Sequence, residues 1–172
     1  MKKKLIAAGL LTGVIAFGTS ISTAGAYEFL GNKIVAPQSL TYYIGSSVGE
    51  WNVDARHGVF AWDPAYEVAV YGEVYNKSQA RIRFEKSSTD TGNYASEVSE
   101  CRCTTSDYSN ITFWKSYPGL SDAREKEVAA HEVGHSLGLD HEDDVASIMY
   151  ETRFLDKIYP VADDWAGIRA RY

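Results

Sequence analysis

The sequence predicts an α+β protein in which a mixed sheet is combined with a few helices. Several short runs alternate apolar with polar residues, as half-buried strands do, and other runs have the apolar spacing of helices. We expect strands in four segments, at residues 39–45, 67–75, 79–87 and 110–117. Residues 87–110 are polar without a clear period, so they predict a long surface loop or an irregular hairpin.

Two helices are predicted near the two ends of this pattern. Residues 50–64 space their apolar side chains about four and three apart and end in a proline, which predicts an amphipathic helix that Gly58 weakens. Residues 163–172 have apolar side chains three apart and begin with two acids, which predicts a C-terminal helix capped by Asp163 or Asp164.

A third helix is predicted over residues 123–137. Asp122 can serve as its N-cap, and Glu125, three residues later, completes a capping box. No proline interrupts the run, so it is the longest helix that the sequence predicts.

The first 26 residues have the features of a secretory signal peptide. Three lysines precede an apolar run over residues 5–17, and the small residues Ala24, Gly25 and Ala26 form a cleavage pattern. The apolar run is shorter than the roughly 20 residues of a bilayer-spanning helix, so we expect no stable membrane insertion. The expected product is a secreted, extracellular protein of one domain, residues 27–172, either released or associated with the cell surface.

Charge argues against nucleic acid as a partner. The whole chain has 17 Lys and Arg against 23 Asp and Glu. Three of those lysines lie in the signal segment, so residues 27–172 retain 17 − 3 = 14 basic against 23 acidic side chains, a formal charge of −9. Such a surface repels nucleic acid and anionic lipid.

Two cysteines, Cys101 and Cys103, are separated by one residue. They cannot join distant parts of the fold, and a bond between them would require a tight turn. A local disulfide, two free thiols and thiolate ligation of a metal all remain open interpretations.

Three of the four histidines lie within eleven residues. His131 and His135 are four apart on the predicted helix, so both imidazoles face the same side and can bind one metal ion. Catalytic zinc takes three protein ligands and leaves a fourth position for water. Gly138 can adopt a positive φ and reverse the chain after the helix, which brings His141 to the same point as the third ligand.

Glu132 follows the first of these histidines. Its carboxylate projects one helical step away, where it can reach a water on the metal without binding the metal itself. Because zinc lowers the pKa of its water to about 7, a carboxylate in this place can act as general base and pass the proton to a leaving amine. Downstream, Met149 lies eight residues after the third histidine.

Together these residues resemble the signature of the metzincin metalloproteases, and in particular of their matrixin branch. The motif consists of His131, Glu132, His135, Gly138, His141 and Met149. The stretches SLTYYI, VFAW, ARIRF, SIMY and DDWAGIRARY also follow the matrixin order. The resemblance implies a twisted mixed sheet with an active-site helix and a C-terminal helix. It further implies that the three histidines bind zinc, that Glu132 is the base, that Met149 lies beneath the metal, and that a peptide binds along an exposed sheet edge.

The chain also departs from the animal matrixins. We find no propeptide cysteine that would block the zinc, and residues 87–121 lack the histidines that hold a second, structural zinc in those relatives. We therefore expect one zinc, and we interpret His57 as a surface or core residue. Calcium is a possible second cofactor, because acidic residues cluster at Asp140, Glu142, Asp143, Asp144, Asp163 and Asp164.

The sequence thus predicts a small, monomeric, secreted zinc endopeptidase without a prodomain, acting on protein or peptide substrates. Residues 150–161 are expected to form the pocket for the side chain after the cut bond, and Phe154, Leu155 and Ile158 predict an apolar preference. The alternative is a secreted binding or adhesion module that retains the scaffold and its zinc without proteolysis. Glu132 favours the enzyme, since a site that only binds zinc has no use for a carboxylate there.

Overall fold

The computed structural model describes residues 27–102 and 105–172. The predicted signal segment and Cys103 lie outside these residues. The strands are β1 Lys33–Ile34, β2 Leu40–Ile44, β3 Val70–Glu73, β4 Ile82–Lys86, β5 Ala95–Arg102 and β6 Thr105–Phe113. The α-helices are α1 Asn52–Phe60, α2 Asp122–Ser136 and α3 Ala162–Arg171. Short 3-10 helices are η1 Pro37–Ser39, η2 Ser46–Trp51, η3 Lys77–Gln79 and η4 Tyr117–Gly119.

The strands form one mixed sheet, which confirms the predicted class. Strands β6, β4, β2 and β3 lie side by side in this order, and each runs parallel to its neighbour. The short β1 pairs in parallel with the beginning of β6. Strand β5 runs antiparallel to β6 and pairs with it along its whole length. Among the described residues β5 has no second partner strand, so it forms one edge of the sheet.

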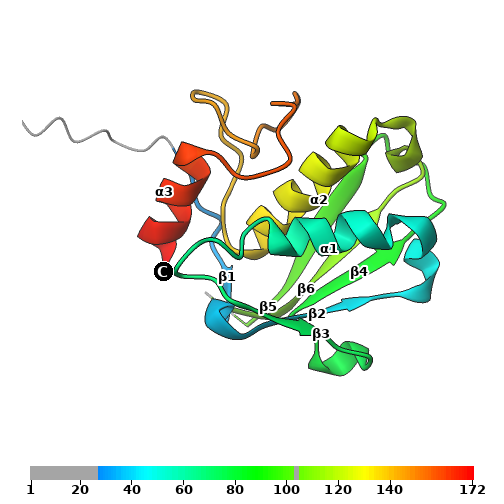
Figure 1. Cartoon of the computed structure of the whole chain (residues 1–172), viewed down its shortest axis with the longest axis horizontal. Coiled ribbons are helices and arrows are strands. Elements are labelled where there is room, and N and C mark those ends of the chain that lie inside the picture. Colours follow the sequence, from blue (N-terminus) through cyan, green and yellow to red (C-terminus); the bar gives the residue numbers. More distant parts are fainter. Residues whose placement is uncertain (1–26, 103–104) are drawn as a thin grey trace, which may run out of the picture.

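Two helices cover one face of the sheet. Figure 1 shows α1 and α2 lying side by side over the strands, while α3 lies beyond the C-terminal end of α2. The core between the helices and the sheet is apolar and almost fully buried; its largest side chains include Trp62, Phe84, Phe113 and Tyr117. None of the helices in the described ranges is long and apolar enough to cross a bilayer.

The predicted helix at residues 50–64 proves shorter than expected. Helix α1 ends at Phe60, well before the proline, and the residues before it form the 3-10 helix η2. Gly58 has a packing reason to be there, because a Cβ atom at this position would lie 2.6 Å from the carbonyl oxygen of Ala129 on α2. The two helices therefore approach as closely as they do only because α1 has a glycine at the crossing.

Of the two alternatives predicted for residues 87–110, the irregular hairpin is confirmed, although the bounds of its edge strand β5 were not predicted. The segment expected to be a loop or an irregular hairpin contains a regular antiparallel pair, β5 with β6, broken only by a bulge between Glu100 and Cys101. Its residues are mostly polar: Val98 is exposed to solvent, whereas Glu97, on the opposite face, accepts hydrogen bonds from Ser99 and Ser109. No apolar alternation therefore marks the strand. The neighbouring strand β6 begins at Thr105, five residues earlier than expected.

The helix caps also differ from the prediction. Ser121 occupies the N-cap position of α2 without a side-chain bond, and Asp122 instead forms an ion pair with Lys126, one turn later, at 2.7 Å. In α3 the expected acid does cap the helix, but from its first turn: the Asp164 carboxylate accepts a hydrogen bond from the Val161 backbone N–H at 2.7 Å.

We predict that Gly58→Ala destabilises the protein, by up to about 2 kcal/mol. Alanine gains about 1 kcal/mol of helix propensity, but overpacking against a rigid backbone costs more, about 1–3 kcal/mol. Denaturant unfolding of the variant beside the parent chain measures the difference. Gly31→Ala is the control, because a Cβ there meets nothing within 4 Å. A Gly58→Ala protein as stable as the parent would contradict the close helix crossing.

Candidate metal centre

Helix α2 carries two of the three predicted ligands. His131 and His135 lie one turn apart, with ring centroids separated by 4.5 Å. The helix then ends in a sharp reversal in which Leu139 N–H bonds to the Gly134 carbonyl at 3.0 Å, as in a Schellman motif. Gly138 has φ 94° there, and a Cβ at this position would lie 2.9 Å from the Asn32 carbonyl oxygen. Both the backbone conformation and the lack of space require glycine.

The reversal brings His141 beside the two helical histidines. Of the residues that the structure describes, these three form the group whose ligand atoms converge, all within 4.8 Å of one another. The Nε2 atoms of His135 and His141 are 3.2 Å apart. Two nitrogens about 2.05 Å from a tetrahedral zinc are separated by about 3.3 Å, so this spacing fits zinc.

Backbone carbonyls fix the tautomers of the two helical histidines. His131 Nδ1 donates to the Ile148 carbonyl at 2.8 Å, and His135 Nδ1 donates to the Leu139 carbonyl at 2.9 Å. A ring that donates through Nδ1 has an unprotonated Nε2, which is the form that binds a metal. The donor set therefore suits zinc, which favours imidazole ligands with oriented rings.

Burial keeps the same rings neutral. Desolvation lowers the pKa of His135 to about 4, and it also lowers the pKa of His131 well below the ordinary value, with the neighbouring His135 adding to the effect. Both imidazoles are thus uncharged at neutral pH and need lose no proton to bind a metal.

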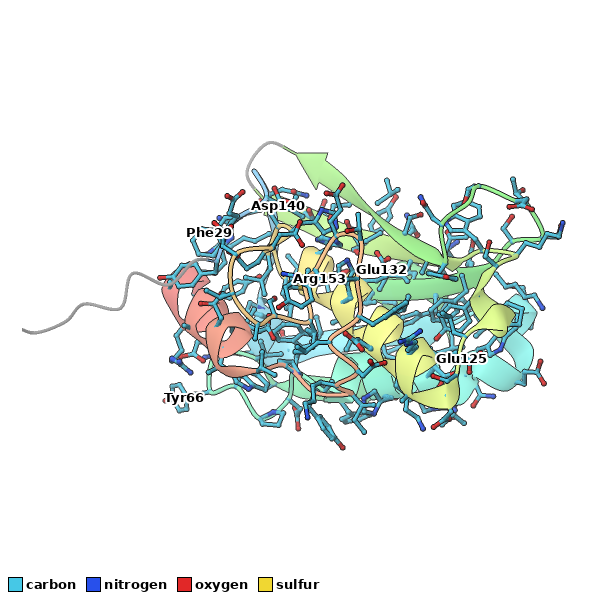
Figure 2. All side chains as sticks on the ribbon, turned by 90° about the horizontal axis from the view of Figure 1, so that it is seen from above. Phe29, Tyr66, Glu125, Glu132, Asp140 and Arg153 are labelled. Atoms are coloured by element: carbon cyan, nitrogen blue, oxygen red, sulfur yellow. The ribbon has the colours of Figure 1, made fainter. Side chains whose placement is uncertain are left out.

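Glu132 lies on α2 between the two ligands and is 6% exposed. Figure 2 shows it on the helix next to the green strands of the sheet, and it lines the same cleft as the three histidines. Burial raises its pKa to about 8, and the nearby Glu97 carboxylate acts in the same direction, while the Glu97 backbone N–H opposes it. A divalent cation on the histidines would favour the charged form and lower this pKa.

A polar seam joins α2 to the sheet below this carboxylate. Glu97 Oε1 on β5 accepts hydrogen bonds from Ser99 Oγ at 2.5 Å and from Ser109 Oγ at 2.6 Å. Ser109 Oγ also lies 2.5 Å from Ser136 Oγ, which in turn donates to the Glu132 carbonyl at 3.2 Å. The seam therefore links the edge strand to the backbone of the helix turn that carries Glu132.

Met149 lies beneath the histidines and is 1% exposed. It packs against Gly134, where a Cβ atom would lie 2.5 Å from the Met149 sulfur, so the helix has no side chain at this contact. Asp164 on α3 holds the turn before the methionine, accepting from Ser147 Oγ at 2.5 Å and from Ile148 N–H at 3.3 Å. Since Ile148 is the residue whose carbonyl orients His131, α3 supports the metal centre indirectly.

The cleft around the triad has a volume of about 520 Å³. One wall is the beginning of β5, the floor is α2, and the opposite wall is the segment after Met149, on which Figure 2 labels Arg153. Phe154 lines the cleft as predicted. Leu155 and Ile158 do not: Leu155 packs against the core, and the Ile158 carbonyl lies 2.5 Å from His57 Nε2 on α1.

The acidic residues proposed for calcium do not form a converging ligand group among the described side chains. Glu142 is buried and accepts hydrogen bonds from the backbone N–H groups of Asp144 and Val145 at 2.6 and 3.3 Å. Asp140 accepts from the His141 backbone N–H at 2.8 Å. These carboxylates, like Asp164, stabilise local turns.

A mixed sheet, a three-histidine centre with two ligands on a helix and the third after a glycine reversal, and an adjacent buried glutamate define a metal-dependent hydrolase of the metzincin kind. The comparison with protein families agrees with this class: the model of the family described as Matrixin matches residues 38–172. The chain belongs to the matrixin family. Membership implies a zinc metalloendopeptidase that acts on peptide substrates, in a family whose members are typically secreted.

Among individual proteins, the chain is similar to interstitial collagenase of Oryctolagus cuniculus. The two are 48% identical over 46 residues, which cover 26% of this chain and 10% of the collagenase. The chain therefore spans only a small part of the length of that relative.

Several residues of the site were not recognised from the sequence. Glu97 and Glu127 place a half-buried and a buried carboxylate around the centre, and Asp164, predicted only as a helix cap or a calcium ligand, also holds the methionine turn. A signal for Glu127 was present, because it lies four residues before His131 and so shares its inward face on α2. No comparable signal marks Glu97, since its burial depends on the pairing of β5.

We predict one tightly bound zinc per chain, because the described residues offer one converging three-histidine set. Elemental analysis of metal-replete protein after removal of loose metal measures this. A ratio of two would contradict the prediction and would direct attention to Cys101 and Cys103.

We also predict how the stability of the metal-free protein depends on Glu132. Its pKa is about 8 in the folded protein against an ordinary 4.5, so between these values the folded chain holds the extra proton. The contribution of Glu132 to the free energy of unfolding then falls as pH rises through this window, at a limiting slope of about 1.4 kcal/mol per pH unit.

Glu132→Gln removes the titration and isolates the effect. The stability of the parent minus that of the variant should decrease from pH 4.5 to 8 and level off above. Denaturant unfolding in chelator at several pH values measures the difference, and zinc saturation should reduce the decline. A difference that does not change with pH would contradict the buried, protonated carboxyl.

Proposed function

We propose that this protein is a secreted zinc endopeptidase in which Glu132 is the general base and in which His131, His135 and His141 bind the metal. The observation that carries the proposal is the buried Glu132 carboxylate beside three imidazoles whose Nε2 atoms converge. A centre that only binds metal gains nothing from a desolvated acid next to it, because burying a carboxylate is costly. The predicted signal segment supports export.

In the proposed reaction, Glu132 takes a proton from water as the water oxygen attacks the peptide carbonyl carbon. The same carboxyl then gives a proton to the leaving nitrogen as the C–N bond breaks, which leaves a new carboxylate and a new amine. Zinc, when bound, supplies a Lewis acid that acidifies the water and stabilises negative charge on the substrate oxygen. Glu132 needs to change its protonation state twice per turnover, and its burial and hydrogen bond from Glu97 N–H hold it in place for both transfers.

The edge of β5 supports binding of an extended peptide. Ala95, Ser96 and Glu97 line the cleft from the free side of this strand. A peptide added along such an edge gains main-chain hydrogen bonds independent of its sequence, and pockets for alternate side chains provide specificity. The part of the cleft near Val128 and Phe154 is apolar, which supports an apolar side chain after the cut bond.

We predict that Glu132→Gln lowers peptide turnover by roughly 10² to 10⁴ while zinc remains bound, because the change removes the base and keeps all three imidazoles. His135→Ala should instead remove the metal, since two imidazoles leave the coordination incomplete. Zinc content and cleavage of a peptide library are measured on both variants beside the parent chain, with and without chelator.

Two results would contradict the proposal. A Glu132→Gln protein that cleaves at the parental rate would refute the role of this carboxylate. A parent chain that binds zinc yet cleaves nothing in a broad library would favour the binding or adhesion module over the enzyme.

A further inference from the structure

The face of the sheet that α2 covers is polar next to the metal centre. Glu97 on β5 lies opposite the buried Ile111 of β6, so its side chain points to this covered face. Ser109 on β6 points to the same face and is buried, as is Ser136 on α2. Burying polar groups is costly unless they are hydrogen-bonded, and these three side chains are bonded to one another.

The polar seam formed by these side chains fixes β5 to α2. The Glu97 carboxylate accepts the Ser109 hydroxyl at 2.6 Å, and the Ser109 oxygen lies 2.5 Å from the Ser136 oxygen. Ser136 continues the seam to the main-chain carbonyl of Glu132, at 3.2 Å. Among the described residues, β5 has one partner strand only, so the seam is a second attachment for this edge strand.

The backbone of Glu97 makes a separate contact with Glu132. In an antiparallel pair, alternate residues direct their N–H groups away from the partner strand. The Glu97 N–H points in this way to the free side of β5 and bonds to the Glu132 carboxylate. Glu97 is therefore connected to both ends of Glu132, to the carboxylate through its own backbone and to the main-chain carbonyl through the seam.

We propose that Glu97 is a positioning residue for Glu132: its side chain holds β5 against α2 through Ser109 and Ser136, so that its backbone N–H keeps the Glu132 carboxylate in one orientation in the cleft. This inference rests on the proposed peptidase function. A small displacement of a catalytic group lowers turnover strongly, so a shift of the edge strand would reach the reaction through Glu132.

Two other roles for the Glu97 side chain make different predictions. A seam that only stabilises the fold would lower stability without a specific effect on Glu132. Glu97 also lines the cleft, so its side chain could contact the peptide directly. Its bonds to Ser99 and Ser109 disfavour direct contact, because they hold the carboxylate on the covered face of the sheet.

The first measurement is hydrogen exchange of the residue 97 amide, followed by NMR on the zinc-loaded protein. Ser109→Ala interrupts the seam without changing the residue that carries this N–H. We expect protection of the amide to fall by roughly tenfold, because the strand opens locally more often. Ser106→Ala is the matched control: it removes another buried serine hydroxyl of β6, which bonds to Asn32 outside the seam. Its residue 97 amide should keep the parental protection.

The second measurement is a double-mutant cycle on kcat with one peptide substrate. We expect Glu97→Ala to lower kcat by about tenfold and Ser109→Ala by a smaller factor, with zinc content unchanged. In the Glu132→Gln background both effects should shrink to within about twofold, because the residue through which they act is already altered. Glu97→Gln should retain most of the parental kcat, since its amide oxygen can still accept the serine hydroxyls.

Three results would overturn the inference and leave the proposed function intact. The first is parental protection of the residue 97 amide in Ser109→Ala. The second is a kcat that does not fall in Ser109→Ala and Glu97→Ala, or that falls as far in the Glu132→Gln background, which would indicate a role in the fold or in peptide binding. The third is a loss in Glu97→Gln as large as in Glu97→Ala.

Ser109→Ala decides the question alone if Glu97→Ala does not fold. The failure of the proposed function looks different. A parent chain that cleaves no peptide, or a Glu132→Gln chain as fast as the parent, would overturn the proposed function and this inference with it.

Discussion

Three imidazole rings can share one metal only if the nitrogens that face one another carry no protons. This structure meets that constraint with backbone carbonyls: those of Leu139 and Ile148 accept the Nδ1 protons of the two helical histidines. Each carbonyl must therefore be held at a set place, one in the reversal after α2 and the other in the methionine turn. Much of the surrounding structure serves these two positions, and the glycines and carboxylates around the centre follow from them.

The reversal after α2 depends on a positive φ at residue 138 and on the close approach of the Asn32 carbonyl, and only glycine allows both. The segment that contains Glu28 and Leu30 braces it through backbone hydrogen bonds to residues 138 and 140. The methionine turn depends on Asp164, whose carboxylate caps α3 and binds the turn at once. The orientation of the His131 ring thus depends on α3, although this helix carries none of the three histidines.

The sequence was sufficient to predict the parts of this arrangement that rest on local spacing. The helical pair His131 and His135, the glycine reversal and α2 itself follow from periodicity and from one residue type at one position. The bounds of β5 could not be predicted in the same way, because its residues are mostly polar and Val98 is exposed, so no apolar alternation marks the strand. The contact between Gly58 and Ala129 likewise depends on how two helices cross, which no single segment encodes.

Buried acids are the group for which sequence reasoning was least informative. Glu97 and Glu127 resemble surface residues in the sequence, and Asp164 was predicted only as a helix cap or a calcium ligand, yet desolvation raises the pKa of each carboxyl in the fold. What separates them from a surface acid is a partner that is distant along the chain: the Ser109 hydroxyl, the N–H groups after Phe154, and the Ser147 hydroxyl.

Hydrogen bonds within the fold offset the cost of burying these three carboxylates. The buried Glu132 carboxylate has less of this compensation. Burial raises the pKa of the Glu132 carboxyl to about 8, and the Glu97 backbone N–H opposes this shift only in part. A divalent cation on the three histidines would supply a positive charge that stabilises the ionised Glu132 carboxylate. Metal affinity and the ionisation of Glu132 are therefore coupled, and by linkage each favours the other. In the proposed reaction, Glu132 would therefore act as a base once the metal is bound, whereas most of this carboxyl would stay protonated at neutral pH without the metal.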